Sequence, residues 1–216
     1  MRVALKDLEI RGAGNLLGGE QSGHIADVGF DLYMRMVGEA VHEYKSGIIE
    51  TSEPNHDCKV ELPINAHLDA AYVPGERLRL DLYRRLADVR NHEDVNAIEE
   101  ELIDRFGALP QEAQTLLGVA ALRAFAKSIS LREVVAQGKF VRLSPINLAE
   151  STQLKLARMY PGSLYKSASS TALVSLPKSS GWNPSENTAP IVDTSLLAWV
   201  TQVVTELAPT SRGSSS

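Results

Sequence analysis

The stretch Ile10–Ile25, IRGAGNLLGGEQSGHI, combines closely spaced glycines with the polar side chains of Arg11, Gln21 and His24. Glycines let a backbone approach a phosphate closely, so two phosphate-binding signatures need testing. A Walker A loop requires lysine and then serine or threonine after its last glycine, and the chain has no such sequence. A dinucleotide fingerprint requires G-x-G-x-x-G, but Leu17 occupies the third glycine position. The stretch is either a glycine-rich turn or a loop that brings these polar groups close to a partner.

A second candidate group lies in the sequence IEEELIDRF, where Glu101, Asp104 and Arg105 fall at positions i, i+3 and i+4. This spacing places the three charges on one face of a helix, away from the apolar residues. A solvated helix face is the simplest explanation. A patch of mixed sign also suits a reversible protein contact, because charge pairs at an interface rim give orientation with modest affinity.

Other reactive side chains form no convincing centre. His56, Cys58 and His67 lack a fourth metal ligand, and Ser22 beside His24 lacks a third orienting group. Cys58 is the only cysteine, which excludes an internal disulfide and every multi-cysteine zinc site. We therefore expect no metal, no resident cofactor and no catalytic residue in these residues.

Composition predicts a cytoplasmic protein of one or two domains. The chain has 216 residues, 44% of them hydrophobic, and contains neither a run of eighteen apolar residues nor a signal sequence, so no membrane contact is expected. Its net charge of −5 is uneven. Acidic residues crowd Asn91–Glu112 and would repel DNA, whereas basic residues prevail in Ile129–Lys178, where a DNA-binding module is an alternative function.

Apolar spacing, caps and turn residues predict the elements that would hold these groups. Predicted helices cover residues 29–44, 76–89, 92–106, 110–127, 150–160 and 193–207, and predicted strands cover residues 2–10, 58–64 and 171–177 and two parts of 132–144 joined at 137–139. Asn91 and Asp193 are expected N-caps, Gly107 is an expected helix stop, and Pro63 should place its strand at an edge or end. In the helix at 76–89 we expect leucines on one face and arginines on the other.

These elements predict an α+β fold. We expect a glycine-rich segment at residues 1–50, a helix-rich domain with a small, mainly antiparallel sheet at residues 51–208, and a tail at residues 209–216. The boundary is placed in the linker-like residues 46–56, which are rich in serine, proline and asparagine.

The sequence DLEIRGAGNLLGGEQSGHI, followed by VGFDLYMRMVGEAV, closely resembles the end of the motor in the bacterial transcription-repair coupling factor family (Mfd). That family carries there a translocation motif shared with the RecG helicase, recognised by an arginine beside the first glycines and a glutamine before Ser-Gly. Arg11 and Gln21 match both. Further along, ERLRLDLYRRLA and EEELIDRFGALP are similar to the family's C-terminal regulatory domain, so the resemblance covers about Met1–Ala126.

The resemblance implies the C-terminal part of an ATP-dependent translocase on double-stranded DNA that displaces stalled RNA polymerase and recruits nucleotide excision repair. It implies that Arg11 and Gln21 couple ATP hydrolysis to translocation. It also implies that Glu101, Asp104 and Arg105 contact the protein's own N-terminal UvrB-like module, which hides the surface that binds UvrA. ATP and Mg would belong to lobes preceding this stretch in the full-length protein, so we expect no ATPase activity from the 216 residues alone.

Two other functions remain open on the residues alone. One is a freestanding nucleotide- or phosphate-binding enzyme that uses the Gly12–Gly19 loop, and the other is the DNA-binding module at Ile129–Lys178.

Overall fold

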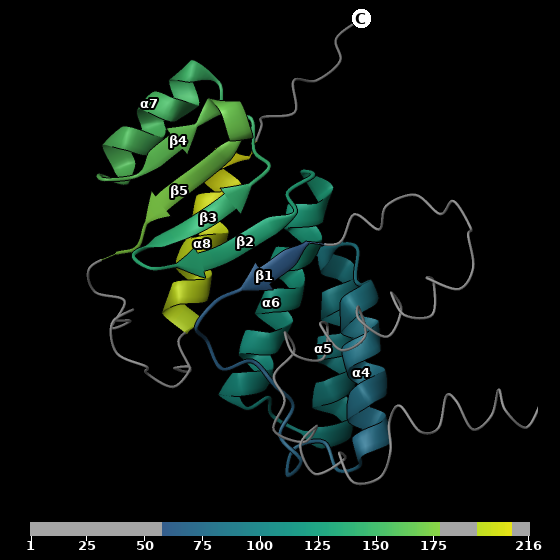
Figure 1. Cartoon of the computed structure of the whole chain (residues 1–216). Coiled ribbons are helices and arrows are strands. Elements are labelled where there is room, and N and C mark those ends of the chain that lie inside the picture. Colours follow the sequence, from purple (N-terminus) through teal and green to yellow (C-terminus); the bar gives the residue numbers. More distant parts are fainter. Residues whose placement is uncertain (1–57, 178–193, 209–216) are drawn as a thin grey trace, which may run out of the picture.

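The structure, a computed structural model, describes residues 58–177 and 194–208 of the chain (Figure 1). Elements are numbered as in Figure 1. Predictions outside the described residues concern the strand at 2–10, the helix at 29–44, the sites Arg11 and Gln21, the boundary at 46–56, the cap Asp193 and the tail at 209–216.

Three consecutive helices follow the first strand, as predicted. They are α4 (Glu76–Asp88), α5 (His92–Phe106) and α6 (Gln111–Ser128). The Asn91 side chain accepts a hydrogen bond of 2.8 Å from the backbone N–H of Asp94, which confirms the predicted N-cap of α5. Gly107 ends α5 with a φ of 84°, a value that favours glycine, and its N–H donates to the carbonyl of Ile103.

The prediction that α4 separates leucines from arginines is wrong at one position. Leu82 and Leu86 are buried and Arg84 is exposed, as expected, but Arg79 lies on the buried face with 7% of its surface exposed. Its guanidinium donates a hydrogen bond of 2.9 Å to the carbonyl of Val73. That bond gives the buried guanidinium a hydrogen-bond partner, as a polar group in a core position requires.

The strands form one five-stranded sheet in the order β1-β2-β3-β5-β4. The strands are β1 (Lys59–Glu61), β2 (Glu133–Gln137), β3 (Phe140–Ser144), β4 (Leu164–Lys166) and β5 (Thr171–Ser175). Among the strands that the structure describes, only β1 and β2 pair in parallel, so the predicted α+β class with a mainly antiparallel sheet is confirmed. β1 lies at one edge, in agreement with Pro63 just beyond it. The short strand β4 and the 3-10 helix Ser167–Ser169 were not predicted.

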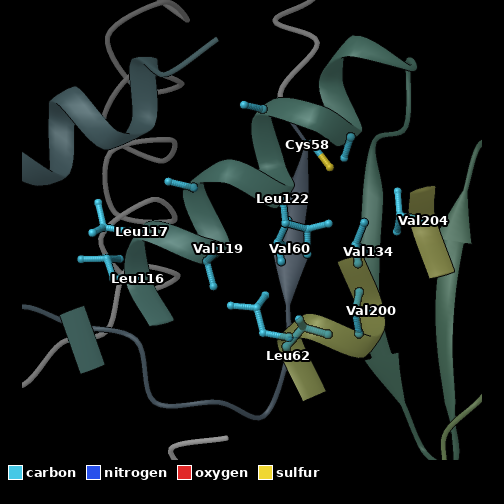
Figure 2. Close-up of a cluster of buried hydrophobic side chains, with 14 of the residues drawn as sticks. Cys58, Val60, Leu62, Leu116, Leu117, Val119, Leu122, Val134, Val200 and Val204 are labelled. Atoms are coloured by element: carbon cyan, nitrogen blue, oxygen red, sulfur yellow. The ribbon is translucent and has the colours of Figure 1, made fainter. Parts of the chain in front are cut away.

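Helices α6 and α8 (Thr194–Leu207) cover one face of the sheet, and α4 and α5 stand beside α6 (Figure 1). Figure 2 shows Leu122 of α6, Val60 of β1, Val134 of β2 and Val200 of α8 in one apolar core. The central strands β3 and β5 present alternate residues to this core, as their pleat requires. A Cβ on Gly118 of α6 would lie 2.7 Å from the Leu197 side chain of α8, so a larger residue there would require that side chain to shift.

The remaining helix, α7 (Glu150–Met159), lies beyond β4 (Figure 1). It confirms the predicted helix at 150–160 and contributes one buried residue, Leu156. None of the helices within the described residues has the length and hydropathy needed to cross a membrane.

Candidate functional site

Helix α5 positions the charged residues singled out from the sequence. Its buried residues Val95, Ile98 and Leu102 face the core, which fixes the rotation of the helix. Glu101 is half-buried on one flank, whereas Asp104 and Arg105 are exposed. We call Glu101, Asp104 and Arg105 the α5 charged surface.

The Glu101 carboxylate binds two guanidinium groups, one on each oxygen. Arg105 Nη1 donates to Oε1 at 2.6 Å, and Arg85 Nη2 donates to Oε2 at 2.6 Å. Arg105 comes from the next turn of α5, the i+4 relationship that the sequence predicted. Arg85 comes from α4, so this ion pair joins two helices.

These contacts keep Glu101 ionised. Its hydrogen bonds with Arg85 and then with Arg105 lower the pKa of the Glu101 carboxyl, against the smaller opposing effect of burial. The same bond raises the pKa of Arg85, helped by the nearby charge of Asp81. The cluster therefore holds one ionised carboxylate between two guanidinium groups.

The cluster is accessible from solvent. The side chains of Arg85, Glu101 and Arg105 are 40%, 28% and 44% exposed. Each guanidinium has donor N–H groups beyond those that reach Glu101, and each carboxylate oxygen has a further lone pair. A partner can thus bind to the cluster without breaking it.

An aromatic pair supports the end of α5 beneath Arg105. The Arg105 guanidinium carbon lies 5.2 Å from the ring centroid of Phe106, and the rings of Phe106 and Tyr72 meet edge to face at 5.8 Å. The Tyr72 hydroxyl, with its single proton, lies within hydrogen-bond distance of the carbonyls of Leu102 and Gly107, at 3.2 and 3.0 Å. These contacts tie the Tyr72 side chain to the C-terminal end of α5.

Asp104 stands apart from the ion pairs. It is exposed on α5, and across the part of the chain that the structure describes no ion pair joins it to Arg105. The structure therefore brings Glu101 and Arg105 together and leaves the Asp104 carboxylate facing solvent.

Arg85 was missed by sequence reasoning. It is 16 residues from Glu101, so no helical spacing relates the two, and only the packing of α4 beside α5 brings them together. In the sequence, Arg85 is only a basic residue in the last turn of α4, and such residues are too common there to indicate a contact with α5.

Residues 58–177 and 194–208 contain no cluster of three histidine, cysteine or acidic side chains able to hold a metal ion. Cys58 is buried, and His67 Nδ1 lies 2.8 Å from Asn65 Oδ1. His56 lies outside the described residues.

The basic region at 129–178 is partly neutralised. Arg142 pairs with Glu133 at 2.8 Å, and Lys155 lies 4.0 Å from Glu206. Lys139 lies over the ring of Phe140 at 5.5 Å. Since duplex binding depends on cations that face phosphates, these pairings weaken the case for a DNA-binding module.

The described residues thus define an α+β domain with a helical layer on one face of a mixed sheet and an exposed charged surface on one helix. The TRCF domain family matches residues 62–157. Over an alignment of 217 positions the chain is 44% identical to the transcription-repair-coupling factor of Mycobacterium tuberculosis, a match that covers 96% of the chain and 17% of that protein. The proteins of the same name from Staphylococcus epidermidis and Bacillus subtilis are 40% and 35% identical, each over 66% of the chain and 12% of their own length.

A solved structure has the same fold. It is a crystal structure of the C-terminal domain of transcription-repair coupling factor, with a TM-score of 0.52 and 17% identity, covering 70% of this chain and 94% of that one. The chain belongs to the transcription-repair-coupling factor family, and it spans about a sixth of the length of its mycobacterial relatives, 17%.

Proposed function

We propose that this chain is the C-terminal regulatory part of a DNA translocase that couples stalled transcription to excision repair. Its α5 charged surface would dock on a UvrB-like module of the same protein and hide the surface that binds UvrA. The observation that carries this proposal is the Glu101 carboxylate, held between Arg85 and Arg105 on a solvent-exposed helix flank.

The geometry suits a docking contact that must be reversible. Each side chain of the cluster is between 28% and 44% exposed, so its contacts with a partner would be those of an interface rim. Exposed charge pairs contribute only about 0–1 kcal/mol each, which gives orientation without an irreversible contact. A competing partner could then displace the domain.

The docking test uses the full-length protein that carries this chain. Replacement of Glu101, Asp104 and Arg105 by alanine should strengthen UvrA binding at least about ten-fold, as expected when a coupling free energy of about 1.4 kcal/mol is removed. The matched control replaces two exposed acids and one exposed arginine elsewhere, Glu93, Glu150 and Arg158. Unchanged UvrA affinity in the triple variant, with docking still intact, would contradict the proposal.

The motor part of the proposal concerns Arg11 and Gln21. ATP and Mg would bind in lobes encoded ahead of this stretch, and Arg11 would change partners as those lobes close, since its planar fork can make defined bonds in each state. Alanine at Arg11 or Gln21 in the full-length protein should leave ATP hydrolysis measurable and abolish movement along double-stranded DNA. Hydrolysis and displacement of RNA polymerase, measured on the same preparation, separate coupling from loss of folding.

A further inference from the structure

We infer that Arg85 is a positioning residue of the docking surface, one that holds the Glu101 carboxylate in the orientation that meets the partner module. This inference rests on the proposed docking function and adds to it a residue from a second helix. Arg85 acts through Glu101, to which its guanidinium is bonded at 2.6 Å.

The two arginines that bind Glu101 constrain its carboxylate differently. Arg105 lies on the same helix as Glu101, one turn on, so it moves with the carboxylate. An exposed pair of this i,i+4 kind is weak and leaves the glutamate free to change rotamer. Arg85 approaches from α4, and its bond therefore fixes the carboxylate relative to a second element of the domain.

Helix α4 is a firm base for this contact. Leu82 and Leu86, which flank Arg85 on the buried side, are each 1% exposed. The buried guanidinium of Arg79 bonds the carbonyl of Val73 and so ties the start of α4 to the preceding loop. Asp81, one turn before Arg85, attracts its charge. The direction from which Arg85 reaches Glu101 is thus set by the core.

Fixing the carboxylate before docking lowers the cost of binding. A glutamate that is free in solution loses rotamer entropy when a partner immobilises it, and a glutamate that is already held loses less. Loss of Arg85 should raise the Kd for the partner module by about five-fold, within the range expected for one immobilised side chain. The effect should vanish when residue 101 can no longer accept the charge-assisted bond.

The experiment measures the Kd of the 216-residue chain for the UvrB-like module by titration calorimetry. Four chains are compared with the wild type: R85Q, R85K, E101Q and the double variant R85Q/E101Q. The matched control is R84Q, because Arg84 is the neighbouring arginine of α4 and is exposed. Circular dichroism and thermal unfolding confirm that each chain is folded, and R85K keeps the positive charge that R85Q removes.

The expected result has three parts. R85Q binds about five-fold more weakly, R85K lies between R85Q and the wild type because an ammonium lacks the planar fork, and R84Q binds like the wild type. In the E101Q background, R85Q has no further effect, which is the signature of a residue that acts through another. An NMR titration should also show a higher pKa for the Glu101 carboxyl in R85Q than in the wild type.

Two results overturn the inference while leaving the docking function intact. One is an R85Q chain that binds as tightly as the wild type. The other is a loss of the same size in both backgrounds, which would make Arg85 a direct contact instead of a positioning residue. A wild-type chain that does not bind the module at all overturns both this inference and the docking function.

Discussion

The Tyr160 hydroxyl donates a hydrogen bond of 3.0 Å to Glu206 Oε2, and this contact joins the end of α7 to α8. The other carboxylate oxygen of Glu206 accepts from Gln202 at 2.9 Å, and the Tyr160 ring packs edge to face on Trp199 with centroids 5.9 Å apart. Because α7 buries only Leu156, this polar and aromatic contact is a main attachment of the helix to the domain.

Tyr160→Phe should lower the free energy of unfolding by about 1 kcal/mol at neutral pH, since it removes one hydrogen bond to an ionised group and keeps the ring. Urea unfolding of the 216-residue chain measures the change. The control is Tyr165→Phe, whose hydroxyl is bonded to the backbone of Ile146 and Leu148 and not to a carboxylate. A Y160F chain as stable as the wild type would show that the Glu206 contact does not hold α7.

The same contact predicts a loss of stability in alkali. Burial, and then the hydrogen bond and charge of Glu206, raise the pKa of Tyr160 from 10.0 to about 12. Because the folded state has the higher pKa, the stabilisation is complete below about pH 10 and is lost as the pH rises toward about 12. After a discount for solvent screening, we expect a loss of about 1 kcal/mol. The difference in unfolding free energy between wild type and Y160F should shrink across this range.

Local sequence signals accounted for most of the fold. The caps Asn91 and Gly107 and the glycine turn at Gly138 were visible in the sequence because each acts within a few residues of itself. The strand β4 was missed because three residues are too few to show an alternating apolar pattern. Its one aliphatic residue, Leu164, is 53% exposed and so does not mark a buried face. Its strand character comes from pairing with β5, a tertiary contact.

Long-range contacts set the limit of sequence reasoning at the site. The Glu101–Arg105 pair followed from helical spacing, but the Glu101–Arg85 pair depends on how two helices pack. The burial of Arg79 was equally invisible, since an arginine reads as a surface residue until its buried carbonyl partner is known. Resemblance to a family, and not spacing, assigned roles to Arg11 and Gln21, whose positions lie outside the described residues.

Arg123→Met should be among the most destabilising single changes. Arg123 is 5% exposed, and its guanidinium donates to the carbonyls of Cys58 and Ala87 at 3.1 and 3.2 Å, linking α6 to α4 and to the residue before β1. Methionine fills similar space and leaves both carbonyls without this donor, so we expect a loss of about 2–4 kcal/mol. Arg84→Met, on an exposed face, should stay within about 0.5 kcal/mol of the wild type. Equal stability of the two variants would refute the linking role of Arg123.

Asn91→Ala tests the cap of α5 and hence the support of the charged surface. It removes the side-chain bond to the N–H of Asp94, and a loss of about 1 kcal/mol is expected. Asn96→Ala is the matched control, because Asn96 is exposed in the middle of the same helix and alanine has the higher helix propensity. Thermal unfolding should show a lower midpoint for N91A and an unchanged or higher one for N96A. The opposite order would mean that the cap contributes nothing.

Glu101→Gln should remove stability at neutral pH but not in acid. The bonds from Arg85 and Arg105 lower the pKa of the Glu101 carboxyl below its ordinary value of 4.5. Because the folded state has the lower pKa, the stabilisation is present above about pH 4.5 and is lost as the pH falls through the folded pKa. Because the side chain is 28% exposed and solvent screens its ion pairs, E101Q should lose only about 1 kcal/mol of unfolding free energy at about pH 7. Urea unfolding at a series of pH values should show the unfolding free energies of wild type and E101Q converging in acid. A difference that stays constant down to about pH 2 would mean that the ionised carboxylate is not its source.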